Sequence, residues 1–332
     1  MTQPSTTTVF DSFFTSTITK YEKGLAKNFI EYRPSIKVLM DDYGHKDSGG
    51  YQVQIPVEFG TNSNTKFFNP YDTIDTTPAE YALPAIYPWR HIASSAAISD
   101  IEMIANSGKE KIFDLFEGRI RQAIRSMANL LGSEIYSDGT SFGGNTIVGL
   151  AAGVSITPTA NPSSGAVGGI DAASQTFWRN NATTSCGSFA TYGVNGSSAD
   201  KVITAFNNCT DGMHDRPNVI LSDQNCFEYY NKTLLSTVHY NDPTHKAMGD
   251  MSFSGLEYQG VPWYWDRQCT SGRMFMLNTS YLHFVTDPGM FFTWTEPRTW
   301  PNQLTKIRLV TLRCALVYKA RMFHAVLDGW AA

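Results

Sequence analysis

The chain has 332 residues, which is enough length to bury a large hydrophobic core. It is 42% hydrophobic and 13% aromatic but only 17% charged, against roughly 25% charged residues in an ordinary soluble domain. This composition excludes intrinsic disorder, and a net charge of −4 leaves no overall positive charge for wrapping nucleic acid. We expect a protein that buries much surface, either internally or against copies of itself.

Neither a membrane span nor export is expected. No run reaches 18 consecutive apolar residues, and the first ten residues lack the basic and apolar regions of a signal peptide. The cysteines are odd in number, widely spaced and without a C-x-x-C pair. This pattern predicts reduced, buried thiols in a cytosol. The five are Cys186, Cys209, Cys226, Cys269 and Cys314.

Local charge is more informative than the total. Residues 39–105 contain three basic and nine acidic residues, a net charge of −6. Residues 298–332 contain six basic residues and one acidic residue, a net charge of +5. The contrast predicts two surfaces with different roles.

Residues 1–38 are rich in Ser and Thr, with apolar residues scattered at helix-like spacing. They hold too little apolar surface to fold alone. We interpret them as an arm that packs on another surface, with a frayed terminus as the alternative. The candidate contact residues of the arm are Phe10, Phe13 and Phe14.

Residues 39–100 are predicted to form a long acidic hairpin. Residues 51–59 alternate apolar and polar side chains, which is typical of a strand, and Pro56 favours an edge position. A turn-rich stretch leads to a second extended run, where Pro84 and Pro88 are expected to prevent a continuous ladder. A two-stranded ribbon is marginal in water, so it should lie on another surface.

Residues 108–136 give the clearest helix, with an expected length of roughly 43 Å. Their apolar residues recur at steps of three and four and form one stripe. No heptad pattern continues along it, so we expect the spine of a domain rather than a coiled coil. The stripe consists of Ile112, Phe116, Ile120, Ile124, Met127, Leu131 and Ile135.

The second half of the chain predicts a compact α/β subdomain. Helices are expected near 198–210 and 223–236, with strands at 219–221, 255–265 and 273–277. The last 30 residues then read as long β structure with interleaved basic residues. Four of these could share one face, which would be either a solvated strand face or a face turned towards phosphate. They are Lys306, Arg308, Lys319 and Arg321.

Two chemical motifs of common enzymes are missing from the sequence. It contains no P-loop and no H-E-x-x-H motif. The closest histidines, His239 and His245, have no cysteine or carboxylate that completes a metal site. We therefore expect no catalytic residue, no cofactor and no metal.

The order of parts resembles the major capsid protein of tailed double-stranded DNA bacteriophages, over about residues 9–330. Four segments carry the likeness. They are GTSFGGNTIVGL (139–150), GGIDAASQTFWRN (168–180), SADKVITAFNNC to RPNVILSDQNCFEYY (198–230) and GLEYQGVPWYWD (255–266).

The resemblance implies an α+β fold in five segments. They are an N-terminal arm (1–38), an extended β-hairpin loop (39–100), a peripheral domain with spine helix 108–136 (101–195), an axial domain (196–298) and a closing β segment of the peripheral domain (299–332).

The implied function is structural, with the chain forming homo-pentamers and homo-hexamers of an icosahedral phage head around DNA. The implied partners are a separate scaffolding protein, a portal protein, a decoration protein and packaged DNA bound without sequence preference, with assembly in the host cytoplasm and residence in the virion. Some relatives cross-link a hairpin lysine to a neighbouring subunit, which makes Lys46 and Lys66 candidate inter-subunit residues. An encapsulin-type nanocompartment shell and, as a different class, an α/β hydrolase stay open as alternatives.

Overall fold

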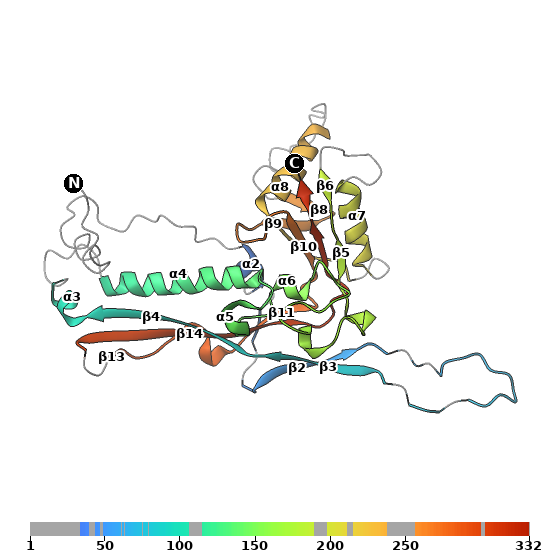
Figure 1. Ribbon diagram of the computed structural model, residues 1–332, viewed down its shortest axis with the longest axis horizontal. Coiled ribbons are helices and arrows are strands. Elements are labelled where there is room, and N and C mark those ends of the chain that lie inside the picture. The colour runs from blue at the N-terminus through green and yellow to red at the C-terminus, as the bar shows by residue number, and fades with distance from the viewer. Residues whose placement is uncertain are drawn as a thin grey trace. The chain divides into compact units, whose positions relative to one another are not determined.

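The computed structural model describes most of the chain after residue 33 (Figure 1). The described residues are 34–39, 44–46, 49–60, 62, 64–74, 76–78, 80–105, 115–188, 198–210, 215–237, 256–299 and 303–331. The expected arm with Phe10, Phe13 and Phe14 lies outside them, as do His239 and His245. Helices and strands are both abundant, which confirms the expected α+β class.

The chain divides into two compact units. Within the described residues, the first unit consists of His91–Leu131 and Asp287–Arg313, and the second of Arg33–Arg90, Gly132–Thr286 and Cys314–Ala332. The five segment boundaries expected from the sequence stay a prediction.

The first unit combines a long helix with an open sheet. Its elements are β4 (Arg90–Ser99), α3 (Asp100–Ala105), α4 (Leu115–Ile135, which ends in the second unit), β12 (Thr293–Trp294), β13 (Arg298–Thr299) and the first part of β14 (Thr305–Tyr318). Strand β14 pairs with β4, β12 and β13. Figure 1 shows α4 beside β4, and the Arg119 guanidinium on α4 donates to the Ala97 carbonyl on β4.

Helix α4 confirms the predicted spine for the residues that the structure describes. Its buried residues Ala123, Met127, Leu131 and Ile135 recur every four residues. Residues 108–114 of the predicted helix lie outside the described part of the chain.

The predicted hairpin is present, and its ladder is continuous. Strands β2 (Gln52–Glu58) and β3 (Ala82–Pro88) pair in antiparallel register over seven residues, with Pro56 opposite Pro84. The expectation that Pro84 and Pro88 interrupt the ladder is wrong. Antiparallel pairs alternate between hydrogen-bonded and non-hydrogen-bonded positions, and all three prolines fall in one alternate set. The other set keeps its N–H groups; its pairs are Val53–Tyr87, Ile55–Ala85 and Val57–Leu83.

The base of the hairpin packs on other parts of the second unit, to which it belongs. Val53, Val57, Ala85 and Tyr87 are buried on one face, and a Cβ built on Gly168 would come within 3.1 Å of the Ala85 side chain. Gly168 lies in the 3-10 turn η2 (Val167–Gly169), where its φ of +64° is one that glycine adopts readily.

The second unit is built on a six-stranded sheet. In spatial order the strands are β5 (Asn181–Thr183), β15 (Ala325–Asp328), β10 (Arg273–Leu277), β7 (Val219–Ser222), β9 (Val261–Trp265) and β8 (Leu256–Tyr258). Helices α7 (Ser198–Asn208) and α8 (Gln224–Thr237) contact this sheet. The predicted helices near 198–210 and 223–236 and the strand at 219–221 are confirmed. The sheet also contains β5 and β15, which lie outside residues 196–298, the range expected for the axial domain.

One predicted strand is two strands. The run 255–265 breaks at Gln259 and Gly260, whose φ angles of 50° and 80° are both positive. Positive φ at two central residues is the mark of a tight type I′ hairpin turn, so β8 and β9 pair antiparallel around it.

The remaining elements of the second unit are short. Strand β11 (Leu282–Thr286), which the sequence did not predict, pairs with β1 (Gly44–Lys46) and with the last part of β14. The others are α2 (Pro34–Lys37), α5 (Ser141–Gly144), α6 (Leu150–Gly153), η3 (Thr176–Trp178), β6 (Gly187–Ser188) and β16 (Trp330–Ala331); η5 (Pro288–Met290) belongs to the first unit. Among the described residues, no helix is both long and apolar enough to cross a membrane.

Candidate functional site

The loop that joins β2 to β3 is the candidate assembly surface; we call residues 59–81 the hairpin loop. Hydrogen bonds hold its two sides together. The Asn64 side-chain amide donates to the Thr77 carbonyl at 2.5 Å, and the Lys66 Nζ donates to the Thr73 carbonyl at 2.9 Å. At the tip, the Asn69 N–H donates to the Asp72 carboxylate at 2.8 Å. The loop therefore has a defined local structure although no sheet surrounds it.

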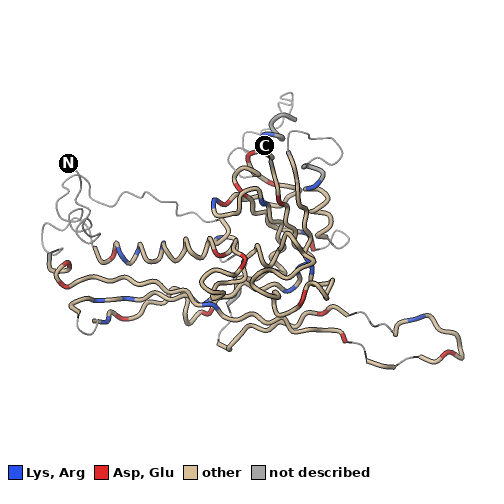
Figure 2. The backbone as a smooth tube through the Cα atoms, viewed as in Figure 1, with Lys and Arg blue, Asp and Glu red and all other residues tan. Residues whose placement is uncertain are grey.

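Large apolar side chains of the hairpin loop face solvent. Phe67 and Tyr71 are fully exposed, at 105% and 100%, and Phe68, Ile74 and Tyr81 are 56–68% exposed. Scattered exposed apolar residues are normal, but several on one short loop mark an interaction surface. Figure 2 shows few charges along this loop. The sequence interpretation predicted the hairpin but did not select these aromatics, although the letters FFNPY inside a turn-rich stretch carried that signal.

The two candidate lysines of the hairpin segment differ in what the structure shows. Lys66 lies on the hairpin loop and its amine is engaged by the Thr73 carbonyl. Lys46 lies in β1, where its backbone pairs with Thr286 of β11. The structure does not describe the Lys46 side chain.

The four candidate phosphate-facing residues are divided between the two units. Lys306 and Arg308 lie in the first unit, half-buried, on the same side of β14 as the buried Val310 and Leu312. Lys306 Nζ lies 3.8 Å from the Asp100 carboxylate, and Arg308 Nε donates to the Thr295 carbonyl at 3.3 Å. Both therefore have partners within the chain.

The other two basic residues belong to the second unit, and only one reaches solvent. Lys319 is exposed. Arg321 is completely buried, so its assignment to a phosphate-facing surface is wrong. The reason is local: residues 319–324 form a turn between β14 and β15 rather than a continuing strand, so face alternation does not apply to them.

The turn folds Arg321 inward. Its Nε donates to the Gly153 carbonyl at 2.7 Å, and its Nη2 donates to the Ala152 carbonyl at 3.4 Å and the Asn180 Oδ1 at 3.2 Å. Arg321 thus satisfies the last carbonyls of α6.

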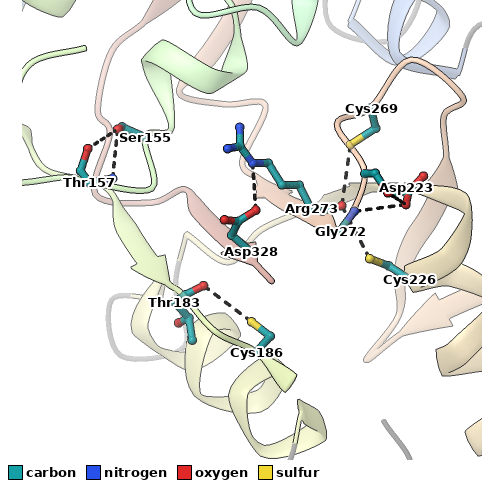
Figure 3. Close-up of polar contacts among 11 residues, drawn as sticks. Ser155, Thr157, Thr183, Cys186, Asp223, Cys226, Cys269, Gly272, Arg273 and Asp328 are labelled. Carbon is teal, nitrogen blue, oxygen red and sulfur yellow. Dashed lines mark hydrogen bonds and ion pairs between the residues drawn. The ribbon is translucent and has the colours of Figure 1, made fainter. Parts of the chain in front are cut away.

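The cysteines are free and buried, as predicted. Figure 3 shows Cys226 and Cys269 directed at the same Arg273 carbonyl, with Sγ–O distances of 3.9 and 3.7 Å. Burial raises the pKa of Cys186 to about 11 and raises the pKa of Cys269 well above its ordinary value. A thiol with a raised pKa stays protonated at neutral pH, and a protonated thiol is a weak nucleophile.

The polar residues around these thiols serve the architecture. Asp223 accepts from the Gln224 N–H at the start of α8 and from the Gly272 N–H (Figure 3). Arg273 pairs with Asp328 across β10 and β15 at 2.9 Å. Among the described residues, no group of three or more His, Cys, Asp or Glu residues is arranged to hold a metal ion.

Comparison with known proteins identifies the fold. No family model matches the sequence, and no curated protein matches it. The capsid of cyanophage A-1(L) superposes with a TM-score of 0.68 at 17% identity, over 95% of this chain and 97% of that one. The capsid of Myoviridae phage XM1 superposes with a TM-score of 0.58 at 9% identity, over 94% of this chain and 97% of that one.

A shell protein that is not a phage capsid matches as well. The encapsulin complex from Synechococcus elongatus gives a TM-score of 0.53 at 12% identity, over 92% of both chains. All these identities are low, and all three matches span nearly the whole chain. The protein therefore has the fold of tailed-phage major capsid proteins, which encapsulin shares.

Proposed function

We propose that this chain is the major capsid protein of a tailed bacteriophage and assembles into pentamers and hexamers of an icosahedral head that encloses double-stranded DNA. The observation that carries the proposal is the near end-to-end match, with a TM-score of 0.68, to a cyanophage capsid chain. The role is structural rather than enzymatic. In this assignment residues 101–195 and 299–332 form the peripheral domain and residues 196–298 the axial domain.

The hairpin loop supplies a physical reason for assembly. Its exposed aromatics, led by Phe67 and Tyr71, have no partner surface within the described residues. In a closed shell each copy contacts its neighbour through two different surfaces, and a projecting loop adds buried area beyond the edges of the body. We expect the acidic segment 39–105 to meet a less acidic surface, so raised ionic strength should weaken capsomers.

The basic residues retain a smaller part of their proposed role. Lys319, exposed in the second unit, is the strongest remaining candidate for facing DNA, with Lys306 and Arg308 as partly engaged candidates. We further propose a separate scaffolding protein, a portal protein and a decoration protein as partners, assembly in the host cytoplasm and residence in the virion. Cross-linking through Lys46 or Lys66 is a weaker part of the proposal.

An encapsulin-type nanocompartment is the second candidate, because the Synechococcus elongatus encapsulin also matches over 92% of both chains. The higher TM-score of the cyanophage capsid favours the phage head. An α/β hydrolase has no comparable support, since the matched structures described above are phage capsids and an encapsulin.

The contents of the shells distinguish the two candidates. The chain would be expressed with its neighbouring genes, and particles would be purified after nuclease treatment. A phage head predicts protected double-stranded DNA, or empty procapsids that contain a scaffolding protein. A stoichiometric enzyme cargo with no nucleic acid would overturn the phage assignment in favour of a nanocompartment.

A further inference from the structure

Arg321 is a buried charge without a buried counter-charge. Its side chain is fully inaccessible, and its three acceptors, on Gly153, Ala152 and Asn180, are all neutral oxygens. No carboxylate among the described residues pairs with it, in contrast to Arg313, which pairs with Asp287 at 2.8 Å. Burial lowers the pKa of Arg321, but an arginine stays protonated at any physiological pH. An uncompensated charge in a low-dielectric interior is costly.

The guanidinium also has an unused donor. Nη1 is buried, and no described residue offers it an acceptor. Native structures leave few buried donors unsatisfied, and the ones that remain commonly bind water or an ion.

His324 presents a second unused donor on the same turn. The Asn278 N–H donates to His324 Nδ1 at 3.2 Å, so Nδ1 is the acceptor nitrogen and Nε2 carries the proton. This Nε2–H is buried and has no acceptor among the described residues. The ring is neutral, because complete burial and then the Arg321 charge lower the pKa of His324 to about 3.

Both side chains come from one hydrogen-bonded turn. The His324 N–H donates to the Arg321 carbonyl at 3.1 Å, which closes the turn. The Tyr318 ring lies edge-on to the imidazole at 6.2 Å, and the Tyr318 hydroxyl is used up by the Gly149 carbonyl at 3.0 Å. The neighbouring hydroxyl of Tyr87 donates to the Tyr318 carbonyl at 2.9 Å. Both hydroxyl groups thus donate to backbone carbonyls.

We propose that Arg321 Nη1 and His324 Nε2 bind one small inorganic monoanion of chloride size inside the second unit. The anion accepts from both N–H groups and neutralises the guanidinium. A water molecule could accept the same two hydrogen bonds, but it would leave the charge uncompensated. The anion supplies the missing counter-charge, and its Coulomb attraction to the guanidinium is stronger in a low-dielectric interior than in water.

The first test measures the melting temperature of the purified full-length protein. Chloride is titrated against gluconate at a constant ionic strength of about 0.15 M, so that general screening does not change. A ligand that binds only the folded state stabilises it saturably, and we expect a rise on the order of 2 °C or more with chloride. No chloride-specific rise would overturn the proposal.

Variants assign the response to the site. Arg321→Met and His324→Phe should each abolish the chloride-dependent rise, whatever their melting temperature in gluconate. The matched control is Arg313→Met, which removes an arginine that has its own carboxylate and should keep the full response. A response that persists in both site variants would contradict the assignment.

Bromide makes the site visible without any mutation, which matters if Arg321→Met fails to fold. Crystals of the protein grown in bromide should show an anomalous peak within hydrogen-bonding distance of Arg321 Nη1 and His324 Nε2. Density without an anomalous signal at that place would identify water and overturn the proposal.

Discussion

The hairpin and the six-stranded sheet of the second unit are both β structures, but the exposure of their large apolar side chains is opposite. In the sheet, Trp263, Phe275 and Leu221 are at most 2% exposed. In the hairpin loop, Phe67 and Tyr71 are at least 100% exposed. The sheet is thus stabilised within one chain, whereas no part of the chain that the structure describes covers the apolar surface of the loop. Folding stability and assembly should therefore respond to different mutations.

The largest effect on folding is expected from Trp263→Ala. The indole is buried, stacks on Tyr230 at 4.7 Å and donates to the Ser222 hydroxyl at 2.7 Å. Its loss should lower the free energy of unfolding by about 3–5 kcal/mol. Urea unfolding followed by circular dichroism measures this change. Trp265→Ala, at a 42% exposed position of the same strand, is the control and should cost far less.

The reverse pattern is expected in the hairpin loop. Phe67→Ser combined with Tyr71→Ser should change the free energy of unfolding by no more than about 0.5 kcal/mol, since both side chains are already solvated. If they are interface anchors, each is worth about 2 kcal/mol in assembly. The protein concentration needed for assembly, followed by light scattering, should then rise at least about tenfold. The pair Phe67→Tyr and Tyr71→Phe keeps both rings and should assemble normally; equal assembly by the serine variant would show that the loop is not an interface.

An intermediate effect is expected at the ion pair of the first unit. Glu102 is 5% exposed and receives both Nη atoms of Arg119, at 2.8 and 2.9 Å. Burial alone would raise the pKa of Glu102, but the hydrogen bonds from Arg119 and the Ser99 N–H outweigh it and lower that pKa. Glu102→Gln should lower the free energy of unfolding by about 1.5–3 kcal/mol at neutral pH.

The pH dependence of this effect has a definite sign. A carboxyl whose pKa is lower in the folded state stabilises fully above its unfolded pKa of about 4.3 and loses that contribution as the pH falls through the folded pKa. The difference between wild type and Glu102→Gln, measured by urea unfolding, should therefore shrink towards acidic pH. A difference that stayed constant down to pH values below the folded pKa would contradict the role of the ion pair.

The smallest effect is expected at an exposed ion pair on α4, the helix that carries Arg119. Glu117 pairs with Arg121 at i,i+4, but their side chains are 58% and 63% exposed. Exposed helical pairs contribute about 0.3–0.5 kcal/mol and are screened by salt. Glu117→Gln should therefore be nearly neutral in the same unfolding assay, and a loss as large as that of Glu102→Gln would show that burial does not decide the strength of these pairs.

Periodic patterns made much of the fold predictable. The stripe through Met127, Leu131 and Ile135 predicted α4, and the alternation of residues 51–59 predicted β2. Features set by single residues or by distant pairing were not predictable in this way. The proline positions could be placed in the ladder only once the register was known, and strand β11 is defined by its pairing with β14.

The candidate site was predicted only in outline. The hairpin was expected, but its exposed aromatics were not selected, although their place in a turn-rich stretch set them apart from the strand aromatics. The prediction that Arg321 faces phosphate was wrong because strand periodicity was extended across a turn. The burial of this arginine also depends on acceptors more than 140 residues away, on Gly153 and Asn180.

The central claim is that the purified chain assembles into shells or their capsomers. Negative-stain electron microscopy of the wild-type protein, expressed alone and with its neighbouring genes, tests it directly. The account predicts closed shells, or rings of five and six subunits. A persistent monomer under both conditions would contradict it.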